Sequence, residues 1–145
     1  MERRHLRGAA TLTAMAYSPQ LIDHFEHPRN VGSLDERHRD VGTALVGSPQ
    51  TGEVIRLQIR IDPAAGLIDQ ACFKAYGSSA AIAASSLATQ WLRGRSLDAA
   101  AAITHADITR ELALPPERVH CALVVTQAIQ AAVSDYRAKH NESNT

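Results

Sequence analysis

The sequence predicts an α+β fold, in which a small antiparallel sheet of about three strands is packed against helices on one face. Two observations lead to this prediction. Apolar and polar residues alternate in residues 55–61, as they do in a half-buried strand, whereas from residue 79 onward the apolar residues recur at helical spacing. Strands followed by a run of helices are typical of the α+β class. No internal repeat and no long linker divides residues 15–138, so we expect them to form one domain.

The sheet is expected to centre on the strand at 55–61, whose isoleucine and leucine side chains point to one face. The polar residues that alternate with them are Arg56, Gln58 and Arg60. A turn at 62–66 leads into a returning strand at 67–76. Residues 41–47 are expected to add a third strand to the same sheet.

Helix start signals divide the rest of the chain. Ser18-Pro19 opens a short helix that ends before Pro28. The expected later helices run from 79 to 93, from 97 to 102 after Ser96, from 105 to 113 after Thr104, and onward from Pro115-Pro116. The basic residues 1–14 are interpreted as an extension or a misassigned start before Met15, and residues 139–145 as a polar tail.

Composition excludes several classes of function. The 15 basic side chains balance the 15 acidic ones, and aromatic residues make up only 4% of the chain. This argues against nucleic-acid binding, which needs a basic field and stacking surfaces. No apolar run reaches the ~18–20 residues of a membrane-spanning helix. Arginine far outnumbers lysine, which is typical of GC-rich bacteria, and the two separate cysteines favour a reducing compartment. We therefore expect a bacterial cytoplasmic protein.

Three loops, at 47–53, 76–80 and 114–121, should gather at one end of this layout, and they carry the most specific sequence motifs. The motifs are Pro28-Arg29-Asn30-Val31-Gly32, Phe73-Lys74, Tyr76-Gly77, Leu114-Pro115-Pro116, His120-Cys121 and Asp135-Tyr136. With these motifs in register, residues 15–138 resemble the IscU/NifU-type iron–sulfur cluster assembly scaffolds. The resemblance implies the same α+β fold and a cluster site where the three loops meet.

In the resembled family a cysteine stands in each of the three loops, because iron–sulfur clusters are held by thiolates. Carried over by position, the first cysteine falls on Thr51 and the second on Ser78, while the third is Cys121. The family's acidic residue corresponds to Glu53 and its histidine to His120. This chain therefore resembles a divergent scaffold in which two of the three cluster cysteines are replaced.

The replacements change the expected ligand chemistry. Hydroxyl groups stay protonated at neutral pH and are hard, weak donors, so a [2Fe–2S] cluster loses two of its bonds. Glu53, His120 and Cys121 remain as three possible ligands, which suits weak, transient binding of iron or zinc. Cys121 is also expected to accept sulfur as a persulfide, with Arg118 one turn earlier favouring its thiolate.

Alternatives stay open for several side chains. A cysteine on a helix is often just a small buried apolar residue, and Cys121 could be one. We interpret Cys72 as incidental, His24 and His27 as a solvated pair, and Trp91 as a core residue.

The resemblance also implies partners. A cysteine desulfurase is expected, together with a frataxin-like protein, ferredoxin and Hsp70/J-protein chaperones. The chaperone motif after Leu114-Pro115-Pro116 is degenerate, because Glu117 and Arg118 replace an apolar residue and a lysine. We expect a monomer or weak dimer that is a scaffold or sulfur acceptor and not an enzyme. Two alternatives remain: a non-catalytic module that docks on the desulfurase and modulates it, and a zinc-dependent sulfurtransferase.

Overall fold

The computed structural model describes residues 17–48, 50 and 52–143. Its elements follow the order expected from the sequence. They are α2 (Pro19–Glu26), β1 (Val41–Ser48), β2 (Glu53–Asp62), β3 (Leu67–Tyr76), α3 (Ser79–Leu92), α4 (Leu97–Ala101), α5 (His105–Leu112), the 3-10 turn η1 (Pro116–Arg118) and α6 (Val119–Ser143). Among the described residues no helix is long and apolar enough to span a membrane.

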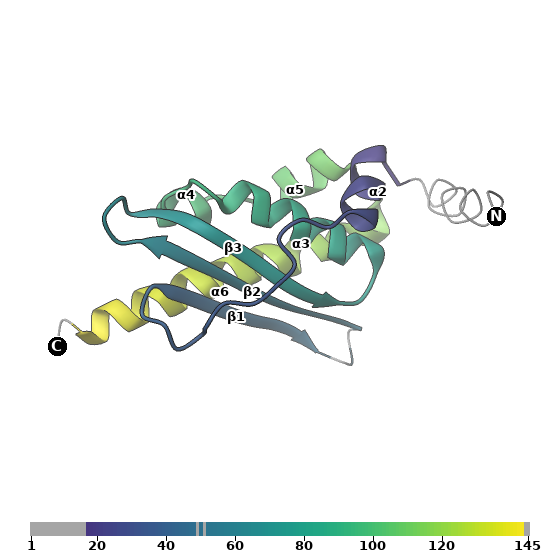
Figure 1. Ribbon diagram of the computed structural model, residues 1–145. Helices are drawn as coiled ribbons and strands as arrows, with labels where there is room; N and C mark the ends of the chain where they lie inside the picture. Colours follow the sequence, from purple (N-terminus) through teal and green to yellow (C-terminus); the bar gives the residue numbers. More distant parts are fainter. Residues whose placement is uncertain (1–16, 49, 51, 144–145) are drawn as a thin grey trace.

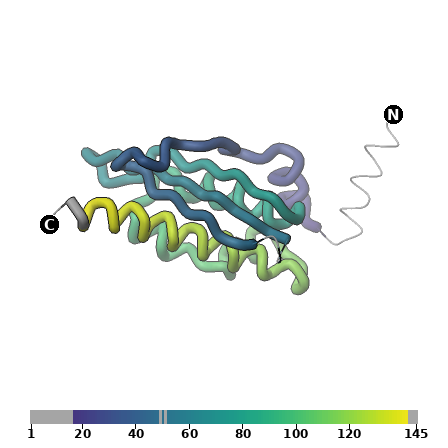
Figure 2. The backbone as a smooth tube through the Cα atoms, turned by 90° about the horizontal axis from the view of Figure 1, so that it is seen from below, coloured from purple at the N-terminus to yellow at the C-terminus, as the bar shows by residue number. Residues whose placement is uncertain are grey.

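The sheet has the order β1-β2-β3, and both pairings are antiparallel. Helices α3 to α6 lie on one face of it, as Figures 1 and 2 show. The predicted α+β fold with a three-stranded sheet is therefore confirmed. The alternation in β2 has the expected effect, because Ile55, Leu57 and Ile59 are all buried against the helices.

Small side chains let the helices approach the sheet closely. Five alanines of α3 and three of α6 are completely buried. At one point the contact is made by backbone, because Gly42 of β1 faces the carbonyl oxygen of Ala132 in α6. Trp91 packs at the margin of this core, as the sequence predicted. The site described below is held at one end of this tightly packed layer.

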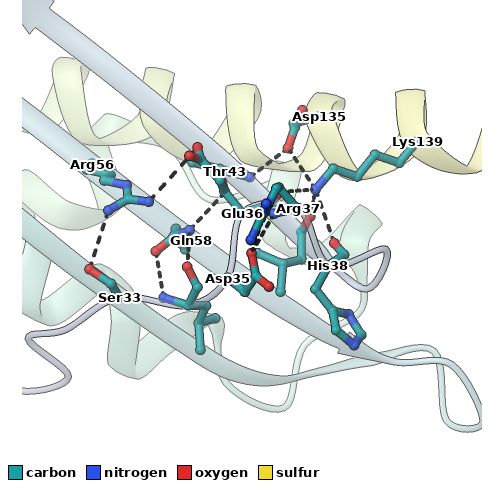
Figure 3. A network of polar contacts seen from close by, with 12 residues as sticks. Ser33, Asp35, Glu36, Arg37, His38, Thr43, Arg56, Gln58, Asp135 and Lys139 are labelled. Carbon is teal, nitrogen blue, oxygen red and sulfur yellow. Dashed lines mark hydrogen bonds and ion pairs between the residues drawn. The ribbon is translucent and has the colours of Figure 1, made fainter.

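The other face of the sheet is partly covered by the extended segment 27–40, which Figure 2 shows on the side opposite the helices. The segment begins at the edge of β3, where Asn30 and Gly32 exchange backbone hydrogen bonds with Phe73. It then crosses to Gln58, whose side chain accepts from the Leu34 N–H and donates to the Leu34 carbonyl (Figure 3). The alternation placed Gln58 on this face correctly, but its near-complete burial was not expected.

The C-terminal helix ties down the end of the same segment. The Lys139 ammonium donates to the carbonyl oxygens of Glu36, His38 and Val41, as Figure 3 shows in part. The Asp135 carboxylate accepts from the Thr43 backbone N–H at 2.9 Å. The sequence assigned residues 139–145 to a polar tail, but α6 continues to Ser143 and includes Lys139, which docks on the segment before β1.

We expect Gly42→Ala to lower the free energy of unfolding by about 1–3 kcal/mol, the usual cost of overpacking. The new Cβ would collide with the Ala132 carbonyl and lie 3.1 Å from the Tyr136 Cβ. Urea unfolding followed by Trp91 fluorescence measures the change. Gly32→Ala is the matched control, because its Cβ would meet nothing within 4 Å, and it should stay within about 0.5 kcal/mol of wild type. Equal stability of the two variants would contradict the described packing of α6.

Candidate metal centre

The three loops predicted to gather do meet at one end of the sheet. Glu53 is the first residue of β2, Ser78 precedes α3, and His120-Cys121 lie in the first turn of α6. The Ser78 hydroxyl donates to Glu53 Oε1 at 2.7 Å. The Cys121 thiol donates to the same oxygen at 3.4 Å and lies 3.5 Å from Ser78 Oγ. One carboxylate oxygen thus joins all three loops.

His120 completes the cluster from the solvent side. Its Nε2 lies 3.7 Å from Glu53 Oε2 and 3.8 Å from Cys121 Sγ. The imidazole side chain is 53% exposed, whereas the Glu53 side chain is 7% exposed. One ligand atom from each of Glu53, His120 and Cys121 fits within a 4.8 Å span. The three side chains thus offer an oxygen, a nitrogen and a sulfur donor at one place.

Local backbone geometry places Glu53 at this point. Ser48 pairs with Glu53 at the end of the β1–β2 hairpin. Gly47 has a φ of +96°, and a Cβ there would collide with the Glu53 carbonyl oxygen. On the other side, a Cβ at Gly77 would lie 3.0 Å from Glu53 Cγ. Two glycines therefore let the neighbouring loops close around the carboxylate.

Ser78 is held by the start of α3. It is the N-cap residue, and its Oγ accepts the backbone N–H of Ala81 at 3.2 Å. Serine is one of the preferred N-cap residues, and such a cap is worth about 0.5–2 kcal/mol. This cap bond holds the Ser78 hydroxyl at the site, so the start of α3 sets where the hydroxyl lies.

Cys121 is completely buried. Burial raises the pKa of its thiol to about 11, the nearby Glu53 carboxylate adds to the rise, and the hydrogen bond with Ser78 opposes it. The sequence predicted that Arg118 would favour the thiolate. The Arg118 charge does lower the pKa, but it is the smallest of the contributions, so the thiol is protonated at neutral pH in this conformation.

Arg118 belongs to the 3-10 turn Pro116–Arg118, which the sequence interpretation merged with the long helix. It is half-buried, and its Nε has no hydrogen-bond partner among the described residues.

The remaining candidate residues lie elsewhere. Thr51 falls outside the described residues. Cys72 lies in β3 on the sheet face opposite the helices, and burial raises its pKa. The expectation of a solvated histidine pair was wrong for His24, which is 7% exposed and bonded to Ser86 Oγ through Nδ1 at 2.8 Å, while His27 is exposed.

Residues 16–143 match the family described as "NifU-like N terminal domain". The chain belongs to this family. It is 53% identical over 125 residues to the iron–sulfur cluster assembly scaffold protein IscU of Haemophilus influenzae, a match covering 86% of this chain and 98% of that protein. It is 45% identical over 142 residues to iron–sulfur cluster assembly protein 1 of Oryza sativa, covering 94% and 83% of the two chains. The suspected relationship to the IscU/NifU-type scaffolds is confirmed.

Solved structures of the NifU-like kind share the fold. A scaffold protein for the SUF system from Fervidobacterium islandicum superposes with a TM-score of 0.65 at 17% identity, covering 82% of this chain and 97% of that one. The N-terminal part of a NifU-like protein from Brucella abortus gives 0.63 at 14% identity, covering 84% and 94%. These proteins therefore share the overall fold of this chain.

The donor set of this NifU-like domain suits a single cation. Zinc and iron(II) both accept Cys sulfur, His nitrogen and Glu oxygen, and three protein ligands leave one position open. A [2Fe–2S] cluster takes four ligands, and these are mostly thiolates. Cys121 is the single thiol in this group, since the chain's other cysteine is Cys72.

We expect Zn²⁺ to bind weakly to the wild-type protein and at least about tenfold more weakly to Cys121→Ser. The thiol is the one soft donor, and its proton must leave when the metal binds. Competition titration against a chromophoric chelator measures both affinities. Cys72→Ser is the control and should match wild type. Equal binding by wild type and Cys121→Ser would place the metal elsewhere.

Proposed function

We propose that this chain works in iron–sulfur cluster assembly as a divergent scaffold, which accepts sulfur on Cys121 and transiently binds iron or zinc through Glu53, His120 and Cys121. The relatives named as iron–sulfur cluster assembly scaffold proteins support the pathway. The observation that carries the divergent role is the hydroxyl of Ser78. It stands 3.5 Å from the Cys121 sulfur, at the position where the family resemblance implies a second thiolate.

The count of thiolates limits what this domain holds by itself. With Ser78 and Thr51 at two of the cysteine positions, one thiol remains for a cluster that needs several. Hydroxyl groups do not replace thiolates on iron at neutral pH. The proposal therefore assigns to this chain a single metal ion or a single sulfur atom, and cluster completion to another protein or a second subunit.

Sulfur would come from a cysteine desulfurase. In the proposed transfer the Cys121 sulfur attacks the outer sulfur of a persulfide on the desulfurase, and a new S–S bond forms at Cys121. The S–S bond of the donor breaks, and its cysteine leaves with the proton that Cys121 gives up, so no outside reductant is required. Because Cys121 is buried, the site must open first, and the exposed His120 side chain is the group that lies on its solvent side.

The enclosed thiol is also the observation that favours a second candidate function. A docking module that modulates the desulfurase needs no reactive sulfur, and Cys121 in this conformation is protonated and inaccessible. In the first function the chain is a scaffold or sulfur acceptor and in the second a docking module, and neither makes it an enzyme. Both also fit residues 15–138 as the working domain in the bacterial cytoplasm.

We expect the isolated protein, reconstituted anaerobically with iron, sulfide and a desulfurase, to hold no stable [2Fe–2S] cluster after desalting. The double variant Thr51→Cys, Ser78→Cys should hold one, because it restores the missing thiolates beside Gly52, Gly77 and Cys121. Visible absorption together with iron and sulfide content measures the result. Stoichiometric cluster on wild type contradicts the proposal. A folded, colourless double variant contradicts the assignment of the two positions.

Intact-mass spectrometry separates a sulfur acceptor from a docking module. Incubation with desulfurase and free cysteine should add one sulfur, about 32 mass units, to wild type and to Cys72→Ala, because Cys121 is the acceptor. The same treatment should leave Cys121→Ala unchanged. A docking module would keep its mass and change the desulfurase rate with or without Cys121. Persulfide on Cys72 alone would contradict the choice of acceptor.

A further inference from the structure

Ser78 makes three contacts at once with a single hydroxyl group. Its hydrogen is donated to Glu53 Oε1 at 2.7 Å, and its oxygen accepts from the Ala81 N–H at 3.2 Å and lies 3.5 Å from Cys121 Sγ. A hydroxyl has one hydrogen to give. The helix cap therefore fixes the oxygen and the carboxylate fixes the hydrogen, so the group has one orientation.

The same contacts give the two oxygens of Glu53 different surroundings. Oε1 accepts from Ser78 and from Cys121, and Oε2 lies 3.7 Å from His120 Nε2. The short 2.7 Å bond sets the rotation of the carboxylate plane. The other contact to Oε1, made by the thiol, is longer, at 3.4 Å, and is lost when the thiol binds a metal.

We infer that Ser78 is a positioning residue for the metal, whose hydroxyl holds Glu53 through Oε1 so that Oε2, His120 Nε2 and Cys121 Sγ converge on one small divalent cation. This inference rests on the metal site of the proposed function. Groups that hydrogen-bond a ligating side chain orient it, and their removal typically costs about 10–100-fold in metal affinity. Ser78 thereby favours a single borderline ion over a thiolate-bound cluster.

A second role of Ser78 must be separated in the test, because it also caps α3. The chain offers a matched control in Ser96, the N-cap of α4. Ser96 Oγ accepts from the Ala99 N–H at 3.1 Å, and the backbone angles of the two caps nearly coincide, with ψ of 161° at Ser78 and 167° at Ser96. Ser96→Ala removes an equivalent cap and no contact to Glu53.

Titration of the full chain with Co²⁺, followed by its visible absorption and its thiolate-to-cobalt charge-transfer band, tests the inference. Ser78→Ala should bind about 10–100-fold more weakly than wild type. Ser78→Thr keeps a hydroxyl and should stay within about threefold, and Ser96→Ala should match wild type. Urea unfolding should show a stability loss for Ser96→Ala, which removes one helix cap, and a larger loss for Ser78→Ala, which also removes a hydrogen bond from the buried Glu53 carboxylate.

The outcomes distinguish this inference from the metal site on which it rests. If Cys121→Ser leaves the Co²⁺ affinity and the charge-transfer band unchanged, the metal site fails and the inference with it. If Cys121→Ser weakens binding and Ser78→Ala does not, the inference alone is overturned. It is likewise overturned if Ser96→Ala weakens binding as much as Ser78→Ala, or if Ser78→Thr binds as weakly as Ser78→Ala.

Discussion

The buried carboxylate of Glu53 is the point on which the functional end of this molecule depends. The Glu53 side chain is 7% exposed, and a carboxylate taken out of water must be compensated by hydrogen bonds. Ser78 and Cys121 supply two of them, and each comes from a different loop. The contact between these loops is therefore maintained by the need to satisfy one charged group, and not by apolar packing alone.

The sheet and its helical layer make that arrangement possible. Alanines on α3 and α6 bring the helices close to the sheet, and the helix starts at Ser78 and Val119 lie beside the first residue of β2. A helix N-terminus offers unpaired N–H groups, and the Ser78 hydroxyl accepts one of them, that of Ala81, for α3. The same side chain thus serves both the fold and the site.

The order of elements was predictable from sequence because it depends on local patterns. Alternation identified β2, and Ser18, Ser96 and Thr104 marked helix starts that the structure confirms. The burial of Gln58 and of His24 was not predictable, since each depends on a partner far along the chain: Leu34 for Gln58 and Ser86 for His24. Periodicity says which face a side chain occupies and not whether another segment covers that face.

The candidate site was also predictable only in part, and here the unpredicted part is its chemistry. The family resemblance predicted that Glu53, Ser78, His120 and Cys121 lie close together. The spacing of residues does not show which side chain donates a hydrogen bond and which accepts it. Read by composition alone, serine in place of cysteine is a loss, because a ligand disappears. In the structure it is also a gain, because serine caps a helix far better than most residues and its short bond holds the carboxylate. A thiol would be a weaker donor to Glu53. We propose that Ser78 orients Glu53 at a position where the family resemblance implies a cluster ligand, and this role would keep the donor set ordered around a single thiol.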